Sequence, residues 1–232
     1  MDRTLLIDNI PVSEYDLYYK ELPDVPSPEQ DIVQVYVKGR DGELTQKYGY
    51  KNIPYPIDLY FYENVSFRKA FRKLKPYLLD ANTLSFADDN EVYYKVKSVQ
   101  IDDAEANIYK LGMFTVEFNL DPFMYELDND PITVTSRTVI ENNGYKALPI
   151  ITAQVSGTGK IYINDQEITI QNVNGSITID SEMQNAYRAG SPPQNMNKHM
   201  IGEFPVLEHG NNVVSFDGDI SELEIICNRR WR

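Results

Sequence analysis

The sequence predicts a mainly β protein, built as an N-terminal β-sandwich with one helix and a second, C-terminal β-sandwich. Apolar and polar residues alternate in many short runs separated by turn residues, and one stretch alone repeats its apolar residues at helical spacing. The pattern changes near residues 127–131, and 232 residues suffice for one large or two smaller β domains. We therefore expect domains at residues 1–130 and 131–232.

The N-terminal segment predicts two short strands with a turn at Asp8 and Asn9. Residues 21–30 then hold three prolines within six positions, which excludes a central strand or a helix interior, so we expect a loop or an extended arm. Further strands of the first domain are predicted by the runs PIDLYFYE, TLSF, VYYKVKSVQI and GMFTVEFNL.

The stretch VQVYVKGRDGELTQKYGY, residues 33–50, predicts a β-hairpin with valines at every second position of its first strand. The pair Asp41-Gly42 favours a type I′ turn, because that turn needs positive φ at both central residues. A cation and an anion, Arg40 and Asp41, lie side by side at the expected tip. Both are candidates for contacts between subunits.

The stretch SFRKAFRKLKPYLLD, residues 66–80, predicts the single helix. Ser66 is the expected N-cap, and Pro76 is expected to end or kink the helix. The spacing i, i+3, i+4, i+7 of a buried stripe is followed by Phe67, Ala70, Phe71 and Leu74.

The other faces of this helix are basic, with five cations in eight residues: Arg68, Lys69, Arg72, Lys73 and Lys75. One interpretation is a solvated helix face. The other is a basic edge that meets an acidic surface of another copy, in a head-to-tail contact that closes into a ring. On the second interpretation we expect inter-subunit contacts from Arg68, Lys69, Arg72 and Lys73.

The chain after residue 131 predicts many short strands separated by turns, as in a β-sandwich or jelly roll. The motif SGTGK, residues 156–160, lacks the first glycine and the final Ser or Thr of a phosphate-binding loop, since Gln154 and Ile161 occupy those places. We expect a tight hairpin there. Residues 185–210 are polar and interrupted by Pro and Gly, which predicts a long surface loop.

The net charge is −13, and most of it lies in the first domain. Residues 1–130 hold 14 Lys and Arg against 24 Asp and Glu, whereas residues 131–232 hold 8 against 11. This balance argues against a protein that coats nucleic acid or binds an anionic membrane surface. The sequence shows no signal peptide and no apolar run of membrane-spanning length, so we expect a soluble protein made in the cytoplasm.

The residue inventory gives little material for catalysis. His199 and His209 lie in no recognisable signature, and Cys227 lies in an apolar strand where a buried thiol is expected. The acidic pairs at residues 88–89, 102–103 and 128/130 lack the glycine and terminal Glu of an EF-hand loop, so we expect solvated turns. We expect no catalytic, cofactor-binding or metal-binding residues.

Several stretches, in order along most of the chain, resemble the distal tail (Dit) proteins of long-tailed phages that infect Gram-positive bacteria. They are VKGRDGEL, FTVEFNLDPFMYE, ENNGYKALPIITAQVSGTGKIYIN, SITIDSEMQNAY, GEFPVLEHGNNVVSF and IICNRRWR. The resemblance implies a ring-forming, tail-tube-like first domain and a galectin-like second domain. It also implies a homohexameric ring without catalytic activity or cofactor.

In that family the ring is a hub of the tail tip or baseplate that joins the tail tube to the tip proteins and lets DNA pass. The expected partners are other copies of the chain, the tail-tube protein, a tail-tip or tail-associated protein and a receptor-binding protein. No specific nucleic-acid binding and no membrane binding are expected. The expected location is the virion, after assembly in the cytoplasm of the host bacterium.

Two alternatives stay open at this point. A carbohydrate-binding β-sandwich that recognises the host surface is one, although the aromatic candidates Tyr187 and Trp231 are far apart in sequence. A tail-associated hydrolase is the other, and it would need an acid/base or metal site.

Overall fold

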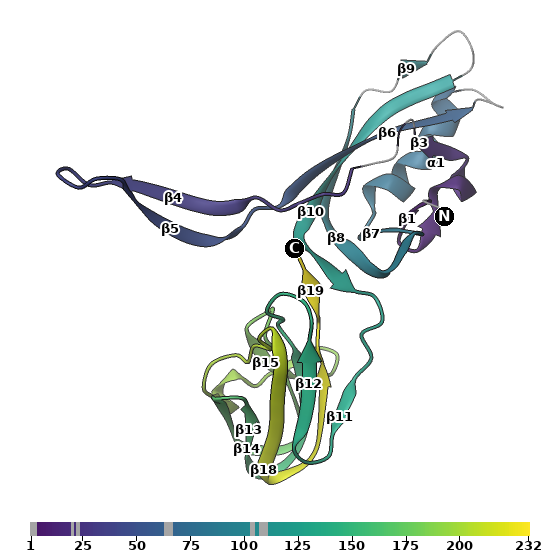
Figure 1. Ribbon diagram of the computed structural model, residues 1–232. Coiled ribbons are helices and arrows are strands. Elements are labelled where there is room, and N and C mark those ends of the chain that lie inside the picture. The colour runs from purple at the N-terminus through teal and green to yellow at the C-terminus, as the bar shows by residue number, and fades with distance from the viewer. Residues whose placement is uncertain (1–3, 20, 22–23, 63–66, 103–104, 107–110) are drawn as a thin grey trace. The chain divides into compact units, whose positions relative to one another are not determined.

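The computed structural model describes the chain except for residues 1–3, 20, 22–23, 63–66, 103–104 and 107–110. It is mainly β, with one α-helix among the described residues, which confirms the predicted fold class (Figure 1). The chain divides into two compact units, residues 1–127 with residue 232 (unit 1) and residues 128–231 (unit 2). Each unit has its own cluster of buried apolar side chains.

Unit 1 is built on an antiparallel sheet with the strand order β2-β1-β7-β8-β10-β6-β3, and β9 also pairs with β10. A 3-10 helix, η1 (Val12–Tyr15), lies between β2 and β3 in sequence. The strands are β1 (Leu5–Ile7), β2 (Ile10–Pro11), β3 (Leu17–Tyr19), β6 (Ile53–Tyr62), β7 (Thr83–Phe86), β8 (Asp89–Ile101), β9 (Glu105–Ala106) and β10 (Leu111–Glu126).

The central strand β6 shows why this sheet has two unlike faces. Its side chains alternate between buried and exposed along most of its length, as the period of two in a strand requires. Phe118 of β10 pairs with Tyr55 of β6 and with Val99 of β8, and this row lies on the core face. The opposite side, the outer face, carries the exposed half of each strand.

The helix α1 (Phe67–Leu79) packs on the core face through Leu74 and Leu78. The ring of Phe71 lies 5.1 Å from that of Phe114 on β10. The helix continues through Pro76, so of the two expected effects of this proline, an end or a kink, the end is wrong. A proline inside a helix removes one hydrogen bond, and the burial of Leu78 two residues later offsets that cost. Ser66, the expected N-cap, lies outside the described residues.

A separate two-stranded sheet is formed by β4 (Gln30–Tyr36) and β5 (Glu43–Tyr50), which we call the arm. Figure 1 shows it extending away from the main sheet of unit 1. The hairpin prediction is correct, but the type I′ turn is wrong: six residues, 37–42, connect the strands, and Asp41 does not have positive φ. Instead the amide of Arg40 donates to the carbonyl of Val37 across a turn whose third residue, Gly39, has a φ of 87°.

Unit 2 has the strand order β11-β18-β13-β14-β15-β16, with β12 also on β18 and β17 also on β14. A short 3-10 helix, η2 (Asn197–His199), precedes β17. Its strands are β11 (Ile132–Val134), β12 (Thr138–Asn142), β13 (Ile150–Ile163), β14 (Gln166–Asp180), β15 (Asn185–Arg188), β16 (Gln194–Asn195), β17 (Met200–Ile201) and β18 (Gly210–Ile226). A further short strand, β19 (Arg230–Trp231), follows in sequence and is not part of this sheet.

Three long strands, β13, β14 and β18, run through the whole of unit 2. One half of β18 pairs with β12 and the other half with β11. The register of β13 shifts against both neighbours between Val155 and Gly159, so one bulge interrupts both ladders at the same level. Such a bulge bends a strand, which lets one strand serve both parts of a curled sheet.

Two expectations for unit 2 are therefore wrong. The motif SGTGK does not form a hairpin, because residues 156–160 lie inside β13 at this bulge, and the connection to β14 comes later, at Asn164 and Asp165. Residues 185–210 are not wholly loop. They contain the 3-10 helix η2 and the strands β15, β16 and β17, which pair with β14 or with one another.

Candidate assembly surfaces

The two histidines have structural partners. His199 Nδ1 lies 3.0 Å from the carbonyl oxygen of Gln171, and His209 Nδ1 lies 3.0 Å from that of Gly144. Cys227 is buried. No group of three or more metal-ligating side chains occurs within the described ranges. Surfaces suited to contact with other proteins are the features that stand out instead.

The arm exposes an apolar face. Val33, Val35 and Leu44 are 44%, 45% and 42% exposed, and Val35 pairs with Leu44 across the hairpin. Val37 and Tyr48 are exposed as well. A two-stranded hairpin is at best marginally stable alone in water, and exposed apolar faces of this kind mark interaction sites. This arm is suited to pack against another protein surface.

The tip of the arm carries the predicted contact residues Arg40 and Asp41, and both are exposed. A Cβ added to Gly39 or Gly42 would meet no atom within 4 Å, so the tip is open. The arm as a whole is neutral, because Lys38, Arg40 and Lys47 balance Asp31, Asp41 and Glu43. The exposed apolar area of the arm, rather than its net charge, is therefore the feature that suits it to contact with another protein.

The helix α1 places its predicted contact residues on the solvent side. Arg68, Lys69, Arg72 and Lys73 are exposed, and within the described part of the chain none of the four has an ion-pair partner. The ammonium of Lys75 lies 4.9 Å from the centroid of the Phe71 ring. The helix has five cations and no acidic residue, so it is a concentrated positive surface on an acidic protein.

No hydrogen bond or ion pair within the described residues joins the helix cations to Arg40 or Asp41. The structure thus brings four of the predicted residues together on one helix and places the other two on the arm.

Three rows of the outer face hold no Lys or Arg, and Lys97, at the adjacent bulge of β8, forms an ion pair with Asp121 at 2.9 Å. Glu117 of β10 lies opposite Gln100 and Pro56, and Asn119 lies opposite Ser98 and Pro54. In the next row the hydroxyl of Thr115 donates to the Asp58 carboxylate at 2.7 Å. These rows are neutral or acidic across three strands. In β6 the exposed members of the rows alternate with buried residues, so the sequence of β6 already indicates which of its side chains lie on the outer face.

Toward one end of the outer face the residues become aromatic. Tyr18 on β3 pairs with Tyr60 on β6, and Tyr60 pairs with Met113 on β10. The rings of Tyr18 and Tyr60 stack at 5.5 Å, and that of Tyr62 lies 5.8 Å from Tyr60. Stacked aromatic rings with exposed edges provide apolar contact area beside hydroxyl groups.

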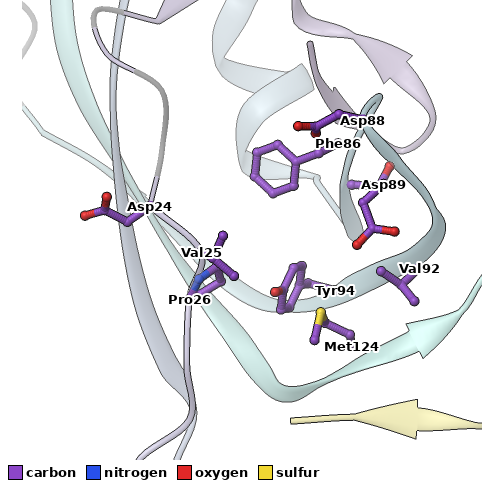
Figure 2. A pocket seen from close by; sticks show the side chains of 10 residues that line it. Asp24, Val25, Pro26, Phe86, Asp88, Asp89, Val92, Tyr94 and Met124 are labelled. Carbon is purple, nitrogen blue, oxygen red and sulfur yellow. The ribbon is translucent and has the colours of Figure 1, made fainter. Parts of the chain in front are cut away.

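A cavity of about 350 Å³ lies in unit 1 between the segment before the arm and strands β7, β8 and β10. Figure 2 shows Val25, Phe86, Tyr94 and Met124 around it, with carboxylates at its margins. We call this cavity the acidic pocket, lined by Asp24, Val25, Pro26, Ser85, Phe86, Asp88, Asp89, Val92, Tyr94 and Met124.

The pKa of Tyr94, in the wall of the acidic pocket, is shifted by its burial and by a neighbouring carboxylate. Burial first, and then the charge of Asp89, raise the pKa of the Tyr94 hydroxyl to about 12.

The sequence gives no sign of this pocket. Asp88 and Asp89 are exposed at the turn between β7 and β8, in keeping with the expected solvated turn. The walls of the pocket come from three segments of the chain: residues 24–26, residues 85–94 and Met124. Strand pairing joins the last two of these segments, because Tyr94 pairs with Met124.

Over most or all of its length the chain is similar in fold to solved structures of phage tail and baseplate proteins. The Dit protein (gp 19.1) of phage SPP1, described as a paradigm of the hub of the adsorption apparatus in phages infecting Gram-positive bacteria, is similar over 100% of both chains, with a TM-score of 0.72 and 15% identity. The phage p2 baseplate in its activated conformation with Sr is similar over 93% of this chain and 91% of that chain, with a TM-score of 0.50 and 9% identity.

No protein-family model and no curated protein matches the sequence. At these identities the likeness establishes the fold, and the structural resemblance predicted from the sequence is confirmed at that level. None of the helices in the described ranges has the length and apolar character needed to cross a bilayer.

Proposed function

We propose that the protein is a structural hub of a phage tail tip, which joins the tail tube to the tip proteins. The full-length likeness in fold to the Dit protein of SPP1 supports this proposal. The role requires protein contacts rather than catalysis, in keeping with histidines that hold loops and with a buried cysteine.

The observation that carries the proposal is the arm. Its apolar face, around Val35 and Leu44, is exposed to solvent, and within the described parts of the chain β4 and β5 pair with each other and with no further strand. The simplest cover is a second copy of the chain. When the arm and its receiving surface are different parts of the subunit, the contact is heterologous, and repeated heterologous contacts close into a ring. The ring we propose has six copies.

In this ring the outer face of the unit 1 sheet lines the channel through which DNA passes. A channel wall that lets DNA slide should avoid cations, since Lys and Arg bind phosphates by releasing counterions. The rows around Asp58 and Glu117 meet that requirement, because their other members are uncharged. The tail tube and a tail-tip or tail-associated protein are the proposed neighbours in the virion, with a receptor-binding protein as a further partner.

The mass of the purified protein tests the proposal. Light scattering at several concentrations is expected to show a species of six copies, and negative-stain electron microscopy is expected to show rings with a central opening. If the protein is monomeric at low concentration, the tail-tube protein added in excess is expected to restore the ring. A chain that stays monomeric with and without that partner, and binds a glycan measurably, contradicts the proposal and supports a carbohydrate-binding module.

A further inference from the structure

The direction in which the arm leaves unit 1 is not set by strand pairing. Within the described residues β4 and β5 pair with each other and with no strand of the main sheet. β5 ends at Tyr50 and β6 begins at Ile53, so the exposed residues Lys51 and Asn52 connect them (Figure 1). A short exposed connection can act as a hinge, so side-chain contacts at the base of the arm decide its direction.

Strand β10 carries an irregularity whose side chains reach this base. Between Leu120 and Met124 β10 advances by four residues, while its partner β8 advances by two, from Val96 to Tyr94. Residues 121–123 thus form a bulge in β10. Bulges of this kind bend a strand and re-aim the side chains that they carry.

A buried carboxylate holds the bulge in shape. Asp121 is 7% exposed, and its Oδ1 accepts hydrogen bonds from the Tyr125 hydroxyl at 2.8 Å and from the Phe123 amide at 3.3 Å. Its Oδ2 lies 2.9 Å from the ammonium of Lys97 on β8. Because a buried charge is costly to leave without partners, these contacts on both strands fix the backbone that carries Phe123.

Phe123 meets the arm. It is 8% exposed, yet it lies outside the cluster of apolar side chains that forms the core of unit 1. Its ring lies edge to face with that of Tyr50, the last residue of β5, with the centroids 5.7 Å apart and the planes at 74°. Such aromatic pairs are favoured beyond the area that they bury. Tyr50 is half-buried, whereas Tyr48, two residues earlier, is 62% exposed.

Two further contacts strengthen this base. Arg232, which belongs to unit 1, donates from Nη1 to the Tyr50 hydroxyl, and its guanidinium lies 5.6 Å from the centroid of the Tyr50 ring. The segment that enters the arm is held separately, because the Tyr55 hydroxyl donates to the carbonyl of Asp24 at 2.7 Å. Anchors on the entering and the leaving side together define a direction, which a single hinge would leave open.

We propose that the bulge of β10 is a seat for the arm: it holds Tyr50 against Phe123 and so sets the direction in which the arm leaves unit 1. This direction is a property of the single subunit and goes beyond the proposed function. Its use in assembly rests on that function, since an arm that already points in one direction loses less conformational freedom when it binds a neighbour. Tyr50 and Phe123 are then positioning residues rather than contacts between subunits.

The distance between two spin labels tests the seat in a single subunit. The labels are attached at Arg40→Cys, on the tip of the arm, and at Gln100→Cys, an exposed site on β8, while the native Cys227 is buried. Every chain in this test also carries Val35→Asp, which is expected to keep subunits apart, and light scattering checks their mass. Pulsed electron paramagnetic resonance is expected to give one narrow distance distribution for this parent chain.

Substitutions on both sides of the ring contact are expected to loosen the arm. Tyr50→Ser should widen the distance distribution by about twofold or more, because the base then has fewer apolar contacts to hold it. Phe123→Leu, which keeps apolar bulk in the bulge, should widen it from the other side. Tyr50→Phe keeps the ring and should stay narrow. Tyr48→Ser is the matched control on the same strand and should leave the distribution as it is in the parent chain. Circular dichroism and thermal unfolding check that each variant stays folded.

These distances can contradict the seat in three ways. A distribution as narrow for Tyr50→Ser as for the parent chain overturns it, and so does equal widening by Tyr48→Ser. Widening by Tyr50→Phe as large as that by Tyr50→Ser would mean that the hydroxyl and Arg232 hold the arm, which overturns the part assigned to Phe123.

The same substitutions without Val35→Asp test the use of the seat in assembly. Tyr50→Ser is expected to weaken self-association by about tenfold and Tyr50→Phe by less than about twofold, as sedimentation measures. A loose arm with undiminished assembly overturns the use in assembly and leaves the proposed function intact. A protein that never self-associates, even with the tail-tube protein present, contradicts the proposed function, while the label distances still decide whether the seat exists.

Discussion

Val35 and Leu44 lie opposite each other on the arm, and nearly half of each side chain is exposed to solvent. Covering these two side chains with a partner protein removes apolar surface from water, which lowers the free energy of the complex relative to the separate subunits.

Val35→Asp is expected to weaken self-association by roughly tenfold, since burying a valine contributes about 1.5 kcal/mol and a carboxylate in its place adds a desolvation cost. Analytical ultracentrifugation measures the effect. The unfolding free energy of the subunit should change by no more than about 0.5 kcal/mol, because the site is exposed. Val139→Asp, at an exposed site on unit 2, is the control and should assemble normally. Equal assembly of both variants would exclude the arm as a ring contact.

The channel assignment leads to a prediction about DNA. Replacing two carboxylates of the outer face, Asp58→Lys with Glu117→Lys, is expected to make assembled rings retain duplex DNA, with an affinity that falls steeply as salt rises. Gel-shift and filter-binding measurements at several salt concentrations check this. Rings of the original sequence should not retain DNA under the same conditions.

Glu222→Lys with Glu224→Lys changes the same charge on unit 2 and serves as the control. If this control retains DNA as strongly as the outer-face variant, net charge rather than the position of the charge explains the binding, and the channel assignment loses its support.

The buried tyrosines of unit 1 predict a loss of stability at alkaline pH. Burial raises the pKa of Tyr94 to about 12, and it also raises that of Tyr55 and Tyr77, above the value of 10.0 for a free tyrosine. Below pH 10 both the folded and the unfolded chain keep these protons. Above pH 10 the unfolded chain releases them first, so the free energy of unfolding falls as pH rises from 10 toward 12.

Urea unfolding at pH 8, 10 and 11, with phenolate absorbance as a second probe, measures this loss of stability. The Tyr94→Phe variant should lose less stability over that interval, while at pH 8 it should unfold nearly as the original protein does. The same alkaline loss in Tyr94→Phe as in the original protein would assign the effect to the other tyrosines.

The bulge in β13 predicts where unit 2 resists substitution. A Cβ on Gly159 would collide with the side chain of Ile220, so Gly159→Val is expected to destabilise unit 2 by about 1–3 kcal/mol. Gly49→Val in the arm is the control, because no atom lies within 4 Å of its Cβ position. Thermal unfolding compares the two variants, and equal melting temperatures would mean that the bulge relaxes without cost.

How far the sequence predicts this protein depends on whether a feature is local. The alternation along β6 and the stripe through Leu74 predict buried faces correctly, because strand and helix periods are properties of neighbouring residues. Of the two effects expected of Pro76, an end of α1 is wrong, because the local cost of a proline leaves out the burial of Leu78, which favours continuing the helix. The motif at residues 156–160 was read as a turn, because a bulge within a long strand also uses glycine.

The acidic pocket marks the limit of such reasoning. Asp24, Asp88 and Met124 meet only after the sheet has formed and the segment before the arm has packed beside it. The spacing of these residues in the sequence does not indicate that they lie close together in the fold. The basic helix, by contrast, is fully visible as a run of five cations within eight residues.

The exposed arm has a consequence for the lifetime of the free subunit. A hairpin with an apolar face and open strand edges can pair with any chain that offers a similar edge, which is a route to aggregation. Ring closure removes this hazard by giving each arm a fixed partner. We therefore expect newly made subunits to stay in solution only when they are dilute or when their neighbours are produced at the same time, so that synthesis of the hub must be matched to that of the proteins it joins.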